Sequence, residues 1–111
     1  MTIEAFAELL FSIDPSTARN DMIGQKGDAY TVFSDYSTSI LYANGRPAGF
    51  LHKIQVDYFT RTEDDPVAFR FLRAFAENDE ITCDYQKDFE TDSRYFHHIF
   101  DCEVVADYGA V

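Results

Sequence analysis

Strict alternation of side-chain character over two long segments is the feature that most restricts what this chain can fold into. In residues 50–60, one face of an extended strand would carry Phe50, His52, Ile54, Val56 and Tyr58. In residues 95–105, one face would carry Phe96, His98, Phe100, Cys102 and Val104. Because successive side chains of a strand point to opposite faces, both segments predict strands with one buried face.

Two other segments have the apolar periodicity of helices. The first begins after Thr2, a good N-cap residue, and ends at Asp14-Pro15, because a residue that precedes proline disfavours helical angles. The second covers residues 66–78, with Pro66 in its first turn and Asp64 or Asp65 as its N-cap. Both predicted helices have one apolar stripe, so we expect each to pack on a sheet.

The remaining segments complete a small sheet. Residues 29–36 and 37–43 favour one or two strands, and Asn44-Gly45 is a strong turn signal. We expect a short strand over residues 81–85 and a polar connection over 86–94. The strand at 81–85 should pair with the one at 95–105 as an antiparallel hairpin. The predicted class is therefore α+β, a small mostly antiparallel β-sheet with two helices packed on one face.

The length of the chain suits one domain. Its 111 residues are enough for a single core and too few for two ordinary domains. We assign residues 1–105 to one α+β domain and expect residues 106–111 to form a flexible C-terminal tail. The first residues lack the positive start of a signal peptide, and no apolar run approaches the ~20 residues that span a bilayer.

The net charge of the chain argues against functions that require binding to a negatively charged partner. The chain has 9 Lys and Arg against 20 Asp and Glu, a formal net charge of −11. A protein that grips DNA neutralises phosphates with Lys and Arg, so this balance argues against direct binding of nucleic acid and of anionic membranes. The acidity is concentrated after residue 75, where 10 acidic residues face two basic ones.

The residues that carry chemistry do not form a recognised catalytic pattern. His97 and His98 are neighbours, so in a strand they point to opposite faces and cannot bind one metal together. A zinc site would need Cys83, Cys102 and a histidine to converge, and two cysteines are too few for a disulfide framework. We therefore expect neither an enzyme nor a cofactor.

Aromatic side chains are abundant in the first strand region. The candidates are Tyr30, Phe33, Tyr36 and Tyr42. They are more than one face of a small sheet hides easily, and interfaces are rich in Tyr and Phe. Two interpretations remain open: ordinary core packing, or a subunit interface.

The order and content of these segments resemble a known family. The residues that carry the resemblance are IQVDYFT at 54–60, the acidic turn 61–65, the helix 66–78, ITCDY at 81–85 and YFHHIFDCEV at 95–104, preceded by the strand and turn ending in YANG, 30–45. Over about residues 25–105 this pattern is similar to the small tail-completion and neck proteins of long-tailed bacteriophages, the tail terminator or head–tail joining family.

This resemblance implies a structural phage or prophage protein. Members of the family usually form six-subunit rings that cap the tail tube and dock to the head connector. It implies a homo-oligomer in the virion neck, assembled in the host cytoplasm, with the major tail protein and head-connector proteins as partners. DNA would pass through the ring without being gripped, and an acidic lumen would let it slide. Our candidate lumen or docking residues are Asp88, Glu90 and Asp92.

Two other classes fit the same sequence features. A small acidic inhibitor or immunity-type protein would use its negative charge to bind a basic protein partner. That protein would stay monomeric or dimeric, whereas a ring subunit would self-associate. A small metal-binding or enzymatic domain would contain stoichiometric zinc.

Overall fold

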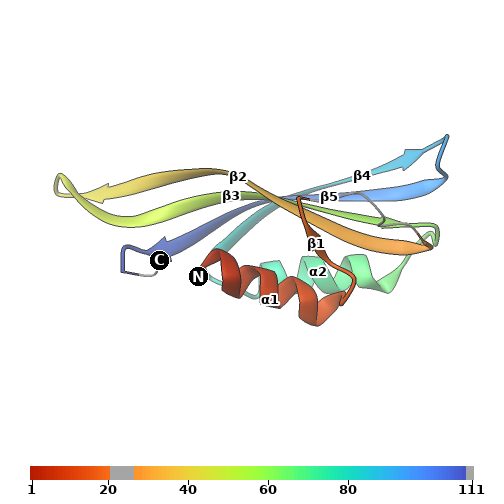
Figure 1. Ribbon diagram of the computed structural model, residues 1–111, viewed down its shortest axis with the longest axis horizontal. Coiled ribbons are helices and arrows are strands. Elements are labelled where there is room, and N and C mark those ends of the chain that lie inside the picture. Colours follow the sequence, from red (N-terminus) through yellow and green to blue (C-terminus); the bar gives the residue numbers. More distant parts are fainter. Residues whose placement is uncertain (21–26, 110–111) are drawn as a thin grey trace.

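Within its described residues, the chain forms a five-stranded sheet with two helices on one face (Figure 1). The computed structural model describes residues 1–20 and 27–109. Its elements are α1 (Ile3–Ile13), β1 (Ala18–Arg19), β2 (Ala29–Ala43), β3 (Arg46–Thr60), α2 (Pro66–Ala76), β4 (Ile81–Glu90) and β5 (Tyr95–Asp107). The strand order is β1-β2-β3-β5-β4, and only the short β1–β2 pair is parallel. The predicted α+β class is confirmed.

Both helices begin at the residue types that the sequence indicates. The Thr2 hydroxyl accepts a hydrogen bond from the Ala5 amide and caps α1. Asp65, and not Asp64, caps α2 by accepting a hydrogen bond of 2.9 Å from the Val67 amide, with Pro66 directly after it. Capping satisfies amides that have no partner within the helix.

The core lies between the helices and the face of β3 and β5 that the alternation predicts. Fully buried side chains on that face include Ile54, Val56, Phe100, Cys102 and Val104. Against them pack Phe6 of α1 and Phe71 and Phe75 of α2. These three rings contact one another or Phe100 at centroid distances of 5.5 to 6.0 Å. Each such side chain contributes about 1.5–3 kcal/mol by leaving water.

Three strands, β3, β4 and β5, are longer than the sequence predicts, while β2 covers the predicted residues 29–43 as a single strand. β2 is one strand of 15 residues with an irregularity between Asp35 and Ser37, and β3 begins at Arg46 instead of residue 50. β4 continues to Glu90, so the expected polar connection over 86–94 is wrong, and only residues 91–94 form the turn. An edge strand exposes most of its side chains, so β4 lacks the apolar alternation that marks a strand in sequence.

The C-terminal end is more ordered than expected. Ala106 and Asp107 belong to β5, and Ala106 is buried. The Val105 amide donates to the Glu80 carbonyl, and the Tyr108 ring stacks on Phe50. Of the expected tail, residues 110–111 lie outside the described residues, as do residues 21–26 of the predicted polar connection.

The molecule is elongated, with principal extents of 50 × 26 × 23 Å. Its radius of gyration, 15.0 Å, exceeds the roughly 13 Å expected of a compact chain of this length. Figure 1 shows the cause: the turn end of the β2–β3 hairpin extends beyond both helices. Neither described helix is long and apolar enough to cross a membrane.

Candidate functional site

The projecting end of the β2–β3 hairpin is the most unusual feature of the surface. We call residues 36–51 the arm. Its tip is a two-residue turn, Asn44-Gly45, with φ angles of 53° and 73°. A two-residue hairpin turn with both central φ angles positive matches the right-handed twist of the strands, and Asn-Gly suits it best. The sequence prediction of a turn here is confirmed.

The arm loses its neighbours towards the tip. β5 pairs with β3 as far as the partners Gly49 and Asp107, while β2 pairs with β3 out to Ala43 and Arg46. Beyond Gly49 the arm is therefore two strands wide and has no helix beneath it (Figure 1). A two-stranded hairpin is only marginally stable alone, so the arm gains most from a partner.

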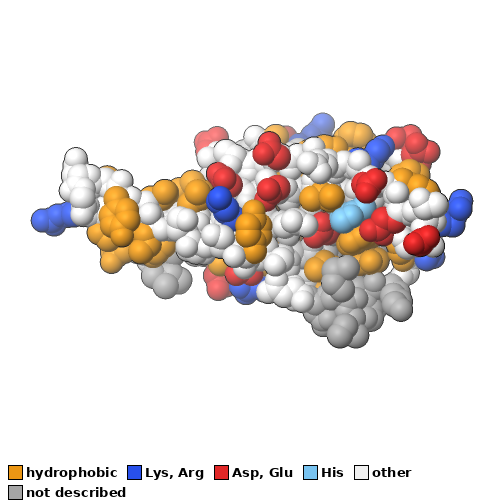
Figure 2. Space-filling view, turned by 90° about the horizontal axis from the view of Figure 1, so that it is seen from above, with side chains coloured by type: hydrophobic (Ala, Val, Ile, Leu, Met, Phe, Trp, Pro, Cys, Tyr) orange, Lys and Arg blue, Asp and Glu red, His pale blue; other side chains and the backbone are white. Residues whose placement is uncertain are grey.

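The surface of the arm is apolar. Tyr36, Ile40 and Tyr42 are 53%, 48% and 65% exposed, and the arm contains one charged residue, Arg46. Figure 2 shows hydrophobic side chains over the narrow end of the molecule, whereas acidic side chains lie over the broad end. Exposed apolar side chains that gather at one end of a molecule are typical of interaction sites.

The four aromatic residues predicted as interface candidates differ in exposure: two are exposed on the arm, one is buried in the core and one is half-buried. Tyr36 and Tyr42 lie on the arm and are exposed. Phe33 is 1% exposed within the core, so it is not available to a partner. Tyr30 is half-buried, stacks on Phe59 at 4.8 Å and meets the edge of the Tyr95 ring.

The outer edge of the arm has no charge. Among the described residues, β2 pairs on that side only with β1, at Val32 and Phe33, and residues 36–43 contain no charged side chain. The opposite edge strand, β4, carries Asp84, Lys87 and Asp88. Charged side chains protect an edge strand from pairing with another chain. The edge of β4 is protected in this way and the edge of the arm is not.

The sheet face that the helices leave uncovered is acidic. A shallow hollow on this face, the acidic hollow, is lined by Tyr36, Lys53, Thr82, Cys83, Asp84, Asp101 and Glu103. Asp84 and Asp101 are direct partners across β4 and β5, an unfavourable placement of like charges. The Tyr36 hydroxyl relieves it by donating a 2.9 Å hydrogen bond to Asp101.

The three candidate lumen residues do not share one loop. Asp88 is exposed within β4, and its carboxylate accepts a hydrogen bond from the Phe89 amide. Glu90 ends β4 and accepts a hydrogen bond from Ser93, and Asp92 lies in the turn. By the strand alternation, Asp88 and Glu90 belong to the same uncovered face as the acidic hollow.

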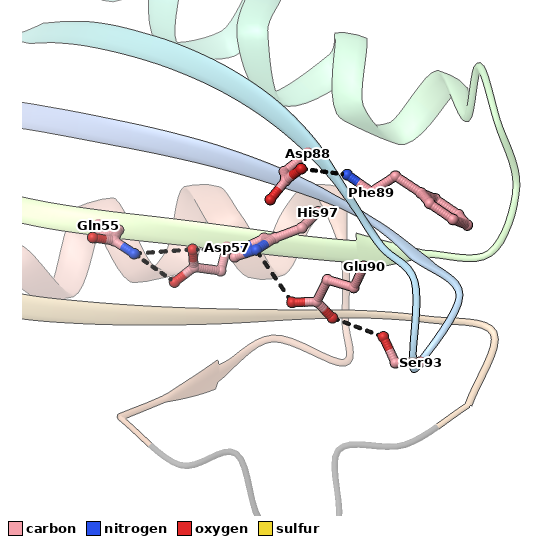
Figure 3. Close-up of polar contacts among 7 residues, drawn as sticks. All are labelled: Gln55, Asp57, Asp88, Phe89, Glu90, Ser93 and His97. Carbon is pink, nitrogen blue, oxygen red and sulfur yellow. Dashed lines mark hydrogen bonds and ion pairs between the residues drawn. The ribbon is translucent and has the colours of Figure 1, made fainter.

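One cluster on this face was not predicted. His97 Nε2 lies 2.8 Å from Asp57 Oδ1, and its Nδ1 lies 3.6 Å from Glu90 Oε2 (Figure 3). Gln55 holds Asp57 with hydrogen bonds of 3.0 and 3.1 Å, and Phe59 stacks on the imidazole. Because both ring nitrogens face carboxylates, His97 bridges β3, β4 and β5. In the sequence, Asp57 and His97 are only two polar residues within alternating strands. Their contact could be expected only once β3 and β5 are known to be neighbours.

A second polar group lies beneath the sheet. Asp65 accepts 2.7 Å hydrogen bonds from the hydroxyls of Tyr58 and Thr60. Burial, assisted by the Asp65 carboxylate, raises the pKa of Tyr58 well above its usual value. Nearby, His98 is 5% exposed; its Nδ1 contacts the Tyr85 hydroxyl at 2.6 Å, and its Nε2 has no partner among the described residues.

The two cysteines are free and directly opposed across β4 and β5. A hydrogen bond from the Cys102 thiol lowers the pKa of Cys83, and the same interaction together with burial raises the pKa of Cys102. Within residues 1–20 and 27–109, no three His, Cys, Asp or Glu side chains are placed to hold a metal ion.

Comparison of the chain with protein-family models and with curated proteins finds no match. The arm, the acidic face and the sequence pattern are therefore the features that bear on function.

Proposed function

We propose that this chain is a structural subunit of a phage or prophage neck, which terminates the tail tube and joins it to the head connector. In this proposal the subunits form a homo-oligomeric ring of six, through which DNA passes without being gripped. The single observation that carries the proposal is the arm. The sequence resemblance points to the tail terminator or head–tail joining family, and the arm offers a surface through which subunits could associate.

The arm supports self-association for three reasons. It exposes the large apolar side chains of Ile40 and Tyr42 and about half of the Tyr36 side chain. It has an unprotected strand edge. It also extends beyond the helices, so a neighbour can contact it without disturbing the core.

The acidic face supports the conduit. Asp84, Asp88 and Asp101 lie on the sheet face that no helix covers, and Figure 2 shows acidic side chains across it. Carboxylates that line a channel repel phosphate, so DNA is not held there. Asp88 and Glu90 are our candidate lumen residues on this face; Asp92, in the β4–β5 turn, is better placed for docking.

Mass measurement by light scattering, followed by negative-stain microscopy, tests the proposal. The wild-type protein should form rings about as wide as a phage tail, alone or on purified tail tubes. The double variant Ile40→Ser/Tyr42→Ser should remain a folded monomer. Phe11→Ser is the matched control, because Phe11 is an exposed apolar residue of α1, 44% exposed and outside the arm. A wild-type protein that stays monomeric under both conditions overturns the proposal.

The acidic hollow favours a second candidate, an inhibitor or immunity-type protein with a basic partner. A Lys or Arg side chain of a basic partner could pair with both of the opposed carboxylates, Asp84 and Asp101. The test is binding to a panel of purified basic nucleases at low and high salt, with Asp84→Asn/Glu103→Gln as the variant. Tight, salt-sensitive binding by a monomeric wild type, weakened in the variant, would favour this candidate over the ring.

A further inference from the structure

We propose that the arm of one copy docks in a groove at the opposite end of a second copy, so that subunits associate head to tail. This inference rests on the proposed function and names the surfaces that would join the ring. The groove, which we call the end groove, is lined by Arg61, Phe89, Asp92, Ser93, Arg94 and Phe96.

The end groove combines two aromatic rings with polar and charged side chains. Phe89 and Phe96 are cross-strand partners in β4 and β5, and their ring centroids lie 4.9 Å apart. Phe89 is 42% exposed, and in Figure 3 its ring points away from the Asp57–His97 cluster. The hollow has a volume of about 480 Å³ and is open to solvent. Aromatic pairs of this kind receive apolar side chains such as Ile40 and Tyr42 well.

The arm and the end groove lie at opposite ends of the long axis. β5 connects them: it starts at Tyr95, next to the groove, and ends at Asp107, opposite Gly49 at the base of the arm. Figure 1 shows the two hairpin turns at opposite extremes of the molecule. The arm of a chain therefore cannot fill its own groove. Such a contact between two different surfaces is heterologous, and it generates rings when the rotation between copies closes.

The end groove offers one carboxylate to the single charge of the arm. The arm carries only Arg46, a charge of +1. The charged residues that line the end groove are Asp92, Arg61 and Arg94. Asp92 lines the groove and is the natural partner of Arg46 from a second copy. Complementary charge sets the register of a contact and disfavours wrong ones.

Two other hollows fit the arm less well. The hollow on the outer side of α2 presents Phe69 and Leu72, but it is lined by Arg70 and Arg73 and, among the described residues, by no carboxylate that could pair with Arg46. The acidic hollow has the right sign, but its lining is mostly charged, so it offers little apolar surface to Ile40 and Tyr42. The end groove combines apolar rings with an acidic side chain.

Mixing two complementary variants tests the inference. The arm variant is Ile40→Ser/Tyr42→Ser, and the groove variant is Phe89→Ser/Asp92→Lys. Each alone should be a folded monomer by circular dichroism and light scattering. An equimolar mixture should give heterodimers and nothing larger, because each pair has one intact arm facing one intact groove. Phe69→Ser, at the competing surface on α2, should assemble like the wild type.

A charge exchange provides the second readout. Arg46→Glu and Asp92→Lys should each weaken association about tenfold or more, and the double variant should recover most of that loss. If the wild type assembles and the groove variant assembles equally well, the inference is wrong while the proposed ring stands. Assemblies larger than dimers in the mixture would also overturn it. A wild type that never associates would overturn both.

Discussion

Gly49 of β3 and Ala106 of β5 approach so closely that a β-carbon at position 49 would lie 2.8 Å from the Ala106 carbonyl oxygen. Real β-carbons essentially never come so close to a backbone atom, so the two strands can meet here only because residue 49 is glycine. The contact lies at the base of the arm, where β5 gives its last support to β3. It therefore fixes where the three-stranded part of the sheet ends and the two-stranded arm begins.

Replacing Gly49 with valine should separate β3 from β5 at the base of the arm. We expect a loss of about 1–3 kcal/mol in the free energy of unfolding, typical of overpacking against a backbone that cannot move aside. Denaturant unfolding measures it. Ala48→Val is the matched control because Ala48 is exposed, and it should change stability little. Equal stability of both variants would contradict the role of this contact.

Removing the Asp65 carboxylate should destabilise the start of α2. Asp65→Ala deletes the N-cap and also leaves the buried hydroxyls of Tyr58 and Thr60 without their acceptor. A lost cap costs about 1 kcal/mol and an unsatisfied buried polar group about 1–3 kcal/mol more. We expect a total near 2–4 kcal/mol by denaturant unfolding. Glu63→Ala, an exposed neighbour, should have almost no effect.

Stability should fall as the pH drops from about 7.5 to 5.5. Burial, with a smaller effect from the Lys87 ammonium and from His97, lowers the pKa of His98, while the Asp65 carboxylate opposes this. Histidine in the unfolded chain titrates near pH 6.5, so below that value the unfolded state binds a proton that the folded state does not. Protonation therefore favours unfolding.

Unfolding curves at pH 7.5 and 5.5 measure this loss. In His98→Phe the difference between the two pH values should shrink. It should not vanish, because burial also lowers the pKa of His52. An unchanged difference in His98→Phe would show that His98 does not contribute.

The two thiols should react at very different rates. Cys83 is partly exposed and its pKa is lowered by its hydrogen bond with Cys102, whereas Cys102 is buried and its pKa is raised. Thiolates are the reactive species. Iodoacetamide should therefore label Cys83 in the native protein and Cys102 only after unfolding, as read by peptide mass spectrometry. Cys83→Ser should abolish native labelling; rapid labelling of Cys102 in that variant would contradict the burial.

The sequence predicts the parts of the fold that local patterns determine. Alternation in residues 50–60 and 95–105 identifies the buried faces of β3 and β5, since those side chains pack on the helices. Thr2 and Asp65 mark helix starts because capping depends on neighbouring residues only. The turn at Asn44-Gly45 is found for the same reason.

The parts that depend on strand order could not be predicted in this way. His97 meets Asp57 because β5 lies beside β3, a fact that no local pattern contains. The sequence leaves open whether residues 29–43 form one strand or two, and it starts the next strand at residue 50 because Pro47 and Gly49 are typical of turns. Pro47 is tolerated in β3 because it lies near the tip, beside an irregularity in the pairing of Leu41 and Tyr42.

The irregularity between Asp35 and Ser37 lies where β2 leaves the body and enters the arm. An extra residue at this point bends the strand and increases its twist. This bend sets the direction in which the arm leaves the body. In a head-to-tail assembly, that direction would determine the angle between one subunit and the next. The circumference of such a ring would then depend on the backbone geometry of one residue at the base of the arm.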